Sequence, residues 1–142
     1  MYRQDAAPDR TLLVTAFNGQ LFAVDRATGN VRWQVTDIPG YGIFEVAIEG
    51  NVVIAVSPTS LAFVDYLTGT KLGVVEIDGE HSRRPTMIVE GGCIYIGRDG
   101  ELSCYTTQGQ RVWHQPFKGR GLGSMALAFP GNVRQADDVG GK

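Results

Sequence analysis

Apolar residues recur along this chain in short runs that are separated by polar turns containing glycine. The first unit holds the runs 12–16, 21–24 and 31–35, and Asn18-Gly19 separates the first two. An Asn-Gly pair favours a tight hairpin because both central positions of the turn require positive φ. The pattern predicts three antiparallel strands joined by short turns.

The same unit returns twice further along the chain. Aligning Gly29 with Gly69 shifts the sequence by 40 positions and starts a second copy at Val52. A third copy starts at Cys93 and keeps the spacing between Gly109 and a tryptophan. A strand-based period near 40 is typical of β-propellers, whereas helical repeats would space their apolar residues by three and four.

Two further apolar segments, 44–51 and 85–92, precede the second and third copies. Both end in an acidic residue, glycine and a turn former, and we expect each to be the inner strand of a four-stranded blade. Residues 5–9 are too polar to supply this strand to the first copy. The pattern returns once more at 124–132, with no credible blade behind it.

The predicted fold class is all-β, with three four-stranded blades of a propeller. Because propellers close with roughly four to eight blades, we expect an incomplete ring that is closed by oligomerisation or by a partner chain. The expected organisation is a polar lead-in at 1–11, a repeat arc at 12–132 and a flexible tail at 133–142. The arc comprises the blades 12–35, 44–75 and 85–117 and an orphan inner strand at 124–132.

The orphan strand suggests how the ring closes. Met125, Leu127 and Phe129 would complete the first blade of a second copy by strand exchange. Two chains with three blades each would then make a six-bladed ring with two-fold symmetry, which would remove the open strand edges. The alternative is that the arc is part of a longer or split propeller.

The most recognisable stretch is Asp25-x-x-Thr28-Gly29-x-x-x-Trp33. It resembles the tryptophan-docking repeat of the pyrroloquinoline quinone (PQQ)-type β-propellers, and the resemblance covers roughly residues 12–131. Similar repeats build quinoprotein alcohol and glucose dehydrogenases, and also non-catalytic propellers such as outer-membrane assembly lipoproteins and sensor domains. The resemblance therefore implies a fold more than an activity.

The conspicuous residues of the repeat are expected to have structural roles. An aspartate can accept hydrogen bonds from the amides of the turn that follows, and a glycine supplies positive φ. Each tryptophan would be buried between adjacent blades, with its indole N–H needing a partner. The residues assigned to these roles are Asp25, Gly29, Trp33, Asp65, Gly69, Gly109 and Trp113.

Composition narrows the function classes. The 142 residues are 43% hydrophobic and carry a net charge of -2 without any basic run, so we expect no nucleic-acid binding. The apolar runs are strand-sized, so we expect no membrane insertion. Residues 1–8 lack a signal-peptide core, which predicts a cytoplasmic location for the chain as given. A fragment of a longer precursor would instead be periplasmic or extracellular.

Candidate chemistry is sparse. The resemblance implies that a quinoprotein dehydrogenase would offer a calcium-binding carboxylate set, a catalytic aspartate, an extra tryptophan and often a vicinal cysteine pair. Cys93 and Cys104 lie apart, on the two arms of one predicted hairpin, and are interpreted as free thiols with a crosslink left open. His81 and His114 lack partners at metal-ligand spacing. We therefore expect no catalytic, cofactor-binding or metal-binding residues, and neither PQQ nor calcium.

The connectors between blades are the longer and more varied loops. Because strands alternate in direction, these connectors and the hairpin turns emerge on one face of the arc. The connectors 36–43, 77–84 and 118–123 carry a mixed aromatic and basic group that predicts a loop face for an acidic partner or ligand, with a solvated surface as the plainer interpretation. The group consists of Tyr41, His81, Arg83, Arg84, Lys118 and Arg120.

The sequence therefore favours a non-catalytic β-propeller scaffold or protein-binding module that assembles with itself or with other subunits. The alternative from the enzyme class is a fragment of a quinoprotein-like dehydrogenase propeller. A small-ligand sensor domain, with its ligand in the central channel, is a third hypothesis.

Overall fold

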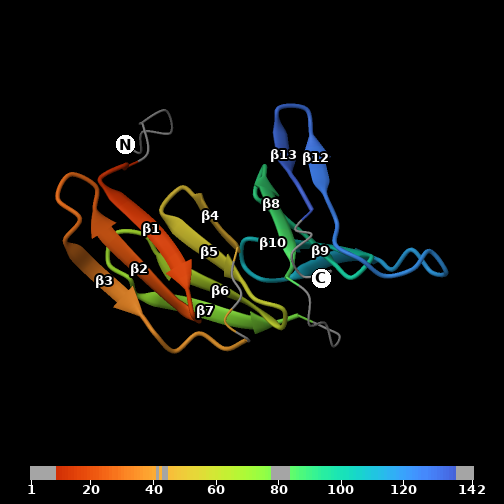
Figure 1. Cartoon of the computed structure of the whole chain (residues 1–142), viewed down its shortest axis with the longest axis horizontal. Helices are drawn as coiled ribbons and strands as arrows, with labels where there is room; N and C mark the ends of the chain where they lie inside the picture. The colour runs from red at the N-terminus through yellow and green to blue at the C-terminus, as the bar shows by residue number, and fades with distance from the viewer. Residues whose placement is uncertain (1–8, 41, 43–44, 78–83, 137–142) are drawn as a thin grey trace.

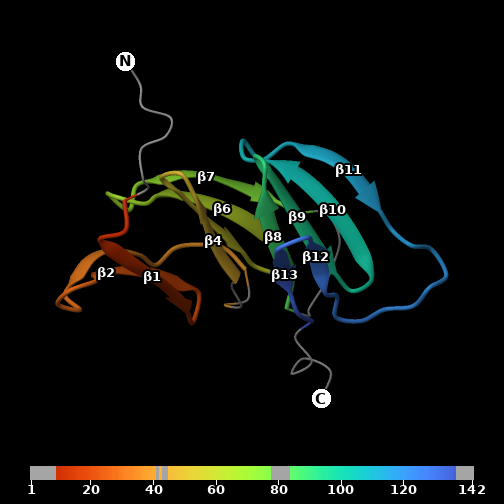
Figure 2. The ribbon, with the colours of Figure 1, turned by 90° about the horizontal axis from the view of Figure 1, so that it is seen from above.

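The computed structural model describes residues 9–40, 42, 45–77 and 84–136. These residues form thirteen β-strands and no helix, which confirms the predicted all-β class. Among them, therefore, no helix has the length and hydropathy needed to cross a membrane. Figures 1 and 2 show separate sheets arranged side by side along an open arc. The described residues do not close a ring.

Three sheets correspond to the three copies of the repeat, and their strands are antiparallel and follow chain order. Blade 1 consists of β1 (Leu12–Phe17), β2 (Gln20–Asp25) and β3 (Val31–Val35). Blade 2 consists of β4 (Glu45–Glu49), β5 (Val52–Val56), β6 (Ser60–Asp65) and β7 (Lys71–Glu76). Blade 3 consists of β8 (Thr86–Glu90), β9 (Cys93–Arg98), β10 (Glu101–Thr106) and β11 (Arg111–Gln115).

The turns have the chemistry that tight hairpins need. Asn18 and Gly19 have φ of 54° and 75°, and Asp99 and Gly100 have φ of 49° and 84°. Positive φ at both central positions matches the right-handed twist of the flanking strands. The last strand of each blade, β3, β7 or β11, pairs with the strand before it through an irregularity in register, which in blade 1 falls between Ala23 and Val24.

The core lies between blades rather than within one. On β5, Val53 and Ala55 pack against blade 1, and Ile54 and Val56 pack against blade 3. Successive strand residues point to opposite faces, so both faces of blade 2 are buried. Each outer blade buries one face against blade 2. Its other face lies at an end of the arc.

Blade 1 has an open inner edge among the described residues, because β1 pairs only with β2. In blades 2 and 3 an inner strand, β4 or β8, covers this edge. On β1 the Tyr66 hydroxyl accepts a hydrogen bond from the Leu12 N–H (2.9 Å) and donates one to the Leu12 carbonyl oxygen (2.7 Å). A side chain from blade 2 thus satisfies the first backbone groups of the edge.

The segment after blade 3 differs from the expected lone strand and tail. β12 (Leu127–Phe129) pairs with β13 (Asn132–Arg134) in a short antiparallel hairpin. Gly131, with φ of 79°, helps form the turn, and the Asn132 side chain donates to Glu90 Oε1 at 3.0 Å. Strand pairing uses backbone groups and needs no apolar side chains, so the polar sequence from residue 132 concealed this strand.

Candidate functional site

The Asp-x-x-Thr-Gly turns are held by their own side chains. Asp25 Oδ1 accepts hydrogen bonds from the N–H groups of Ala27 (2.8 Å) and Thr28 (3.1 Å), which lower the pKa of Asp25. Asp65 Oδ2 accepts from the N–H of Thr68 (2.9 Å) and from its hydroxyl (2.7 Å). These carboxylates therefore have partners inside the turn that they build.

Trp33 joins the first two blades. Its Nε1–H donates to the carbonyl oxygen of Tyr66 at 2.8 Å, and the residue is 8% exposed. The indole covers Gly69, where a Cβ atom would lie 2.7 Å from the ring. Gly69 also has φ of 78°, so both its backbone conformation and its neighbour require glycine.

The junction between blades 2 and 3 uses other side chains. The second copy has Gly73 in the place of the tryptophan, and Val75 Cγ2 lies 2.5 Å from the position that a Cβ of Gly109 would occupy. Phe63 packs beside it at 3.5 Å from that position. Aliphatic and phenyl groups thus fill the space above this glycine turn.

Trp113 stands at the end of blade 3 and is not covered in the same way. It is 42% exposed, whereas Trp33 is 8% exposed. Its ring centroid lies 6.2 Å from that of Tyr95, and Tyr95 packs edge-on against Phe129 of β12 at 5.2 Å. This end of the arc therefore presents an aromatic face that is only partly shielded.

The opposite end of the arc, on blade 1, is also apolar. Leu13 is 62% exposed and Phe17 is 57% exposed, and the rings of Phe17 and Phe22 stack with centroids 5.3 Å apart. These residues were not singled out from the sequence. The sequence signal for this face was the correspondence between the repeats. Leu13 and Val53 are each the second residue of their strands, β1 and β5, and Val53 is buried.

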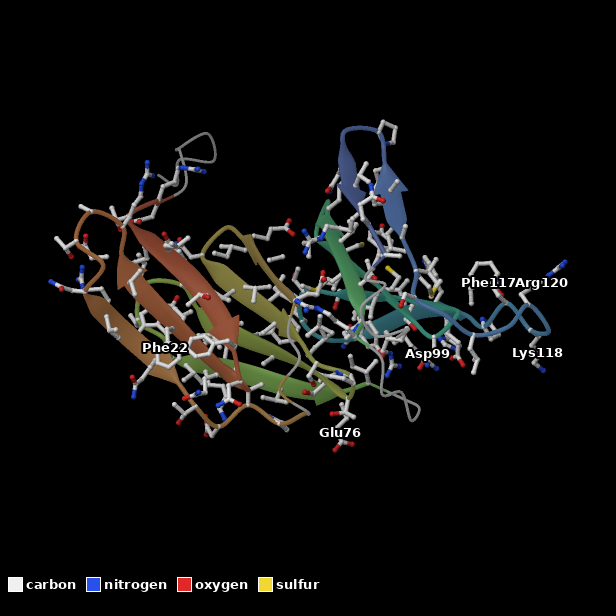
Figure 3. All side chains as sticks on the ribbon, viewed as in Figure 1. Phe22, Glu76, Asp99, Phe117, Lys118 and Arg120 are labelled. Atoms are coloured by element: carbon white, nitrogen blue, oxygen red, sulfur yellow. The ribbon has the colours of Figure 1, made fainter. Side chains whose placement is uncertain are left out.

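The structure describes three of the six residues of the predicted loop group, Arg84, Lys118 and Arg120. Tyr41, His81 and Arg83 lie outside the described residues. Arg84 Nε lies 3.9 Å from Glu45 Oε2, on the inner strand β4. Lys118 and Arg120, by contrast, are exposed on the connector between β11 and β12, together with Phe117 (Figure 3).

The residues assigned to strand exchange are engaged within the chain. A Cβ at Gly97 would lie 3.0 Å from Met125 Cβ and 3.6 Å from Leu127 Cδ2, so both side chains pack on blade 3. The Thr86 hydroxyl donates to the carbonyl oxygen of Met125 at 2.6 Å. Phe129 contacts Tyr95, as described above.

A cavity of about 400 Å³ lies between the inner strands β4 and β8 and strand β13. Glu49 lines it and accepts a hydrogen bond on Oε2 from the N–H of Gly92 at 3.2 Å. Its other oxygen, Oε1, is buried without a hydrogen-bond partner within the described part of the chain. Arg134, also lining the cavity, instead binds Glu45 at 2.8 Å.

Titratable groups offer little reactive chemistry in the described ranges. These ranges contain no group of three or more His, Cys, Asp or Glu side chains placed to hold a metal ion. Cys93 and Cys104 are free, and Cys104 is buried. Burial and the neighbouring Cys93 raise the pKa of the Cys104 thiol to about 11. A thiol reacts as the thiolate, so this environment makes Cys104 a poor nucleophile.

The family model described as outer membrane protein assembly factor BamB matches residues 3–139. Among solved structures, BamB from Moraxella catarrhalis aligns with 21% identity and a TM-score of 0.60, over 83% of this chain and 36% of that chain. This chain therefore spans about a third of the length of that protein. No curated protein sequence matches closely enough to count as a relative.

Two further structures show how widely the fold is used. A europium-containing methanol dehydrogenase aligns with 15% identity and a TM-score of 0.57, over 72% of this chain and 22% of that one. The computationally designed protein Ika4 aligns with 19% identity and a TM-score of 0.68, over 90% of this chain and 82% of that one. At these identities the likeness shows the fold alone.

Proposed function

Because the chain belongs to the family of the outer membrane protein assembly factor BamB, whose model spans residues 3–139, we propose that it is a non-catalytic propeller scaffold that binds proteins. The family confirms the predicted resemblance to PQQ-type repeats. Dehydrogenases share this fold, so the choice between a scaffold and an enzyme depends on the surfaces and side chains of this chain.

One observation carries the proposal: both ends of the arc expose apolar sheet faces. Leu13, Phe17 and Trp113 are 62%, 57% and 42% exposed. Exposed apolar patches of this kind mark protein interaction sites, because burying them against another protein removes apolar surface from water. We infer that the module assembles with itself or with other subunits through these faces.

The connector between β11 and β12 supplies a second, smaller surface for an acidic protein partner. Phe117 is 43% exposed and Leu122 is 79% exposed beside the exposed basic side chains of Lys118 and Arg120. The double change Lys118→Glu and Arg120→Glu should reduce capture of acidic proteins from the source cell. The matched control is the charge-conserving double change Lys118→Arg and Arg120→Lys, which keeps both positive charges at the same exposed positions and should leave capture unchanged.

The enzyme alternative is tested directly with PQQ and calcium. A ligand that binds the folded state raises the melting temperature, so a quinoprotein fragment should be stabilised by PQQ with Ca²⁺ and should reduce a dye with an alcohol as substrate. We expect no change in melting temperature, no PQQ difference spectrum and no dye reduction, with Ca²⁺ alone as the control. Stabilisation together with dye reduction would overturn the scaffold proposal.

A further inference from the structure

Within the described residues, one end of the arc carries a tryptophan, Trp113, without a glycine turn beneath it. Trp33 and Trp113 are each the third residue of the last strand of their blade, β3 and β11. Trp33 covers Gly69 of the following blade and is 8% exposed, whereas Trp113 is 42% exposed. The environment of Trp33 thus shows how a repeat tryptophan is buried on the glycine turn of the next blade. In the described residues Trp113 has no such turn to cover.

The other end carries a glycine turn without a side chain above it. The turn at Gly69 is covered by Trp33, and the turn at Gly109 by Val75 and Phe63. A Cβ built at Gly29 would meet nothing within 4 Å in the described part of the chain. The turn at Gly29 is nevertheless formed, with φ of 80° and a hydrogen bond from its N–H to the Asp25 carbonyl oxygen (2.7 Å).

The strand faces around Gly29 and Trp113 are also complementary, as equivalent residues of the three blades show. Leu13, Val53 and Ile94 are each the second residue of the corresponding strand, β1, β5 or β9. Val53 and Ile94 are 0% exposed because the preceding blade covers them, whereas Leu13 is 62% exposed. The exposed face of blade 1 therefore corresponds to the face with which blades 2 and 3 pack on the blade before them. The exposed face of blade 3 corresponds to the face with which blades 1 and 2 pack on the blade after them.

We propose that Trp113 of one copy packs on the Thr28-Gly29 turn of a second copy, which reproduces between chains the contact that Trp33 makes with Gly69. This inference rests on the proposed function of self-assembly and names the partner as a second copy of this chain. Because each copy carries both halves of the contact, two copies form two identical seams and close three blades each into a six-bladed ring.

The short hairpin after blade 3 must rearrange in this assembly. β13 pairs with β12 as β5 pairs with β4 and β9 with β8, so it occupies the place that β1 of the partner would take. β13 has three residues and Val133 is 53% exposed, whereas β1 has six residues. The exchange breaks the contacts of Asn132 with Glu90 and of Arg134 with Glu45, and the longer β1 replaces them with more strand pairing and more buried apolar surface.

The test is the solution mass of the full chain by light scattering over a range of concentrations. We expect twice the 15.4 kDa of one chain, and loss of the dimer in Trp113→Ala. Val112→Ala is the matched control, because Val112 is the adjacent residue of β11 and is 56% exposed.

Gly29→Asn should also lose the dimer, since asparagine tolerates positive φ but adds a side chain where the indole would lie. Gly119→Asn, at an open connector position with φ of 76°, is its control.

Mixing the two defective variants gives the decisive result. In a mixed dimer, Trp113 of the Gly29→Asn chain meets the intact Gly29 of the Trp113→Ala chain, so one of the two seams is restored. We expect dimers in the mixture under conditions where each variant alone is monomeric. A monomeric wild-type chain, or a mixture that stays monomeric, would overturn the seam. A monomeric wild-type chain would also remove self-assembly from the proposed function, whereas binding of other proteins and the absence of catalysis are tested separately by the capture experiment and by PQQ with calcium.

Discussion

At the scale of single residues, the repeat motif is used to build turns and to join blades. Asp25 and Asp65 are bound within their own turns, and Trp33 is bound to the next blade through Tyr66 and Gly69. The sequence motif indicated which residues are special. It did not show that Trp33 and Trp113 have different environments, because exposure depends on whether another blade follows.

Gly69→Ala should destabilise the protein more than Gly119→Ala. Both positions have φ near 77°, with values of 78° and 76°, so both variants pay about 1–2 kcal/mol for a left-handed non-glycine residue. Only at Gly69 would the new methyl group meet the Trp33 ring at 2.7 Å, which adds roughly 1–3 kcal/mol of overpacking. Urea unfolding measures the difference, and equal losses for the two variants would contradict it.

The Cys104 thiol should remain unreactive until strongly alkaline pH. Its pKa is raised to about 11, by burial first and by Cys93 second. In the Cys93→Ser chain, burial, the larger cause, still raises the pKa of Cys104, so alkylation of the folded protein should be slow at pH 8 and become fast once urea unfolds the chain. A half-maximal rate near pH 9 would contradict this expectation.

The same shift predicts a pH dependence of stability. The folded pKa of Cys104 lies above the unfolded value of about 8.5, so its contribution is complete below that pH and is lost as pH rises toward 11. The free energy of unfolding should therefore fall over this range, and Cys104→Ser should flatten that part of the profile. A profile that Cys104→Ser leaves unchanged would show that another group is responsible.

At the scale of strands, the periodic apolar pattern placed the elements well. The run expected at 52–56 coincides with β5, and the inner strands expected within 44–51 and 85–92 contain β4 and β8. β13 was missed because Asn132 and Arg134 carry no apolar signal, and their partners Glu90 and Glu45 are distant in sequence. The ion pair between Arg84 and Glu45 was likewise beyond reach, because the two residues are distant in sequence.

Tyr66→Phe should loosen the inner edge of β1. The variant removes the hydroxyl that serves both backbone groups of Leu12, and leaving buried polar groups unpaired costs roughly 1–3 kcal/mol. We expect faster hydrogen exchange at the Leu12 amide, with the amide of Val53 in β5 as the internal control. Unchanged exchange at Leu12 would mean that the hydroxyl does not protect this edge.

At the scale of the whole molecule, stability resides in contacts between successive blades. One apolar cluster joins blades 1 and 2, and a separate one joins blades 2 and 3. Such a row of units is stabilised by nearest-neighbour interfaces, so its parts can open at different free energies. The repeat count predicted an open arc, whereas the exposed faces at its two ends required the structure.

Trp33→Ala should separate blade 1 from the rest of the molecule. Removing this buried indole costs roughly 3–5 kcal/mol, and the loss falls on the first interface because Trp33 packs on blade 2 alone. Hydrogen exchange should show early loss of protection in β1 to β3, with β9 and β10 still protected. Simultaneous loss in all three blades would instead indicate a single cooperative unit.

The hydroxyl of Tyr66 on Leu12 also bears on aggregation. An uncovered strand edge is a template on which foreign strands can add, and such growth leads toward fibres. Tyr66 occupies both backbone groups at the first position of β1, so an incoming strand gains nothing there until it displaces a buried side chain. The Tyr66 hydroxyl thereby disfavours addition of an unrelated strand at this position. A partner that also covers Leu13 and the Gly29 turn buries additional apolar surface and can displace the hydroxyl.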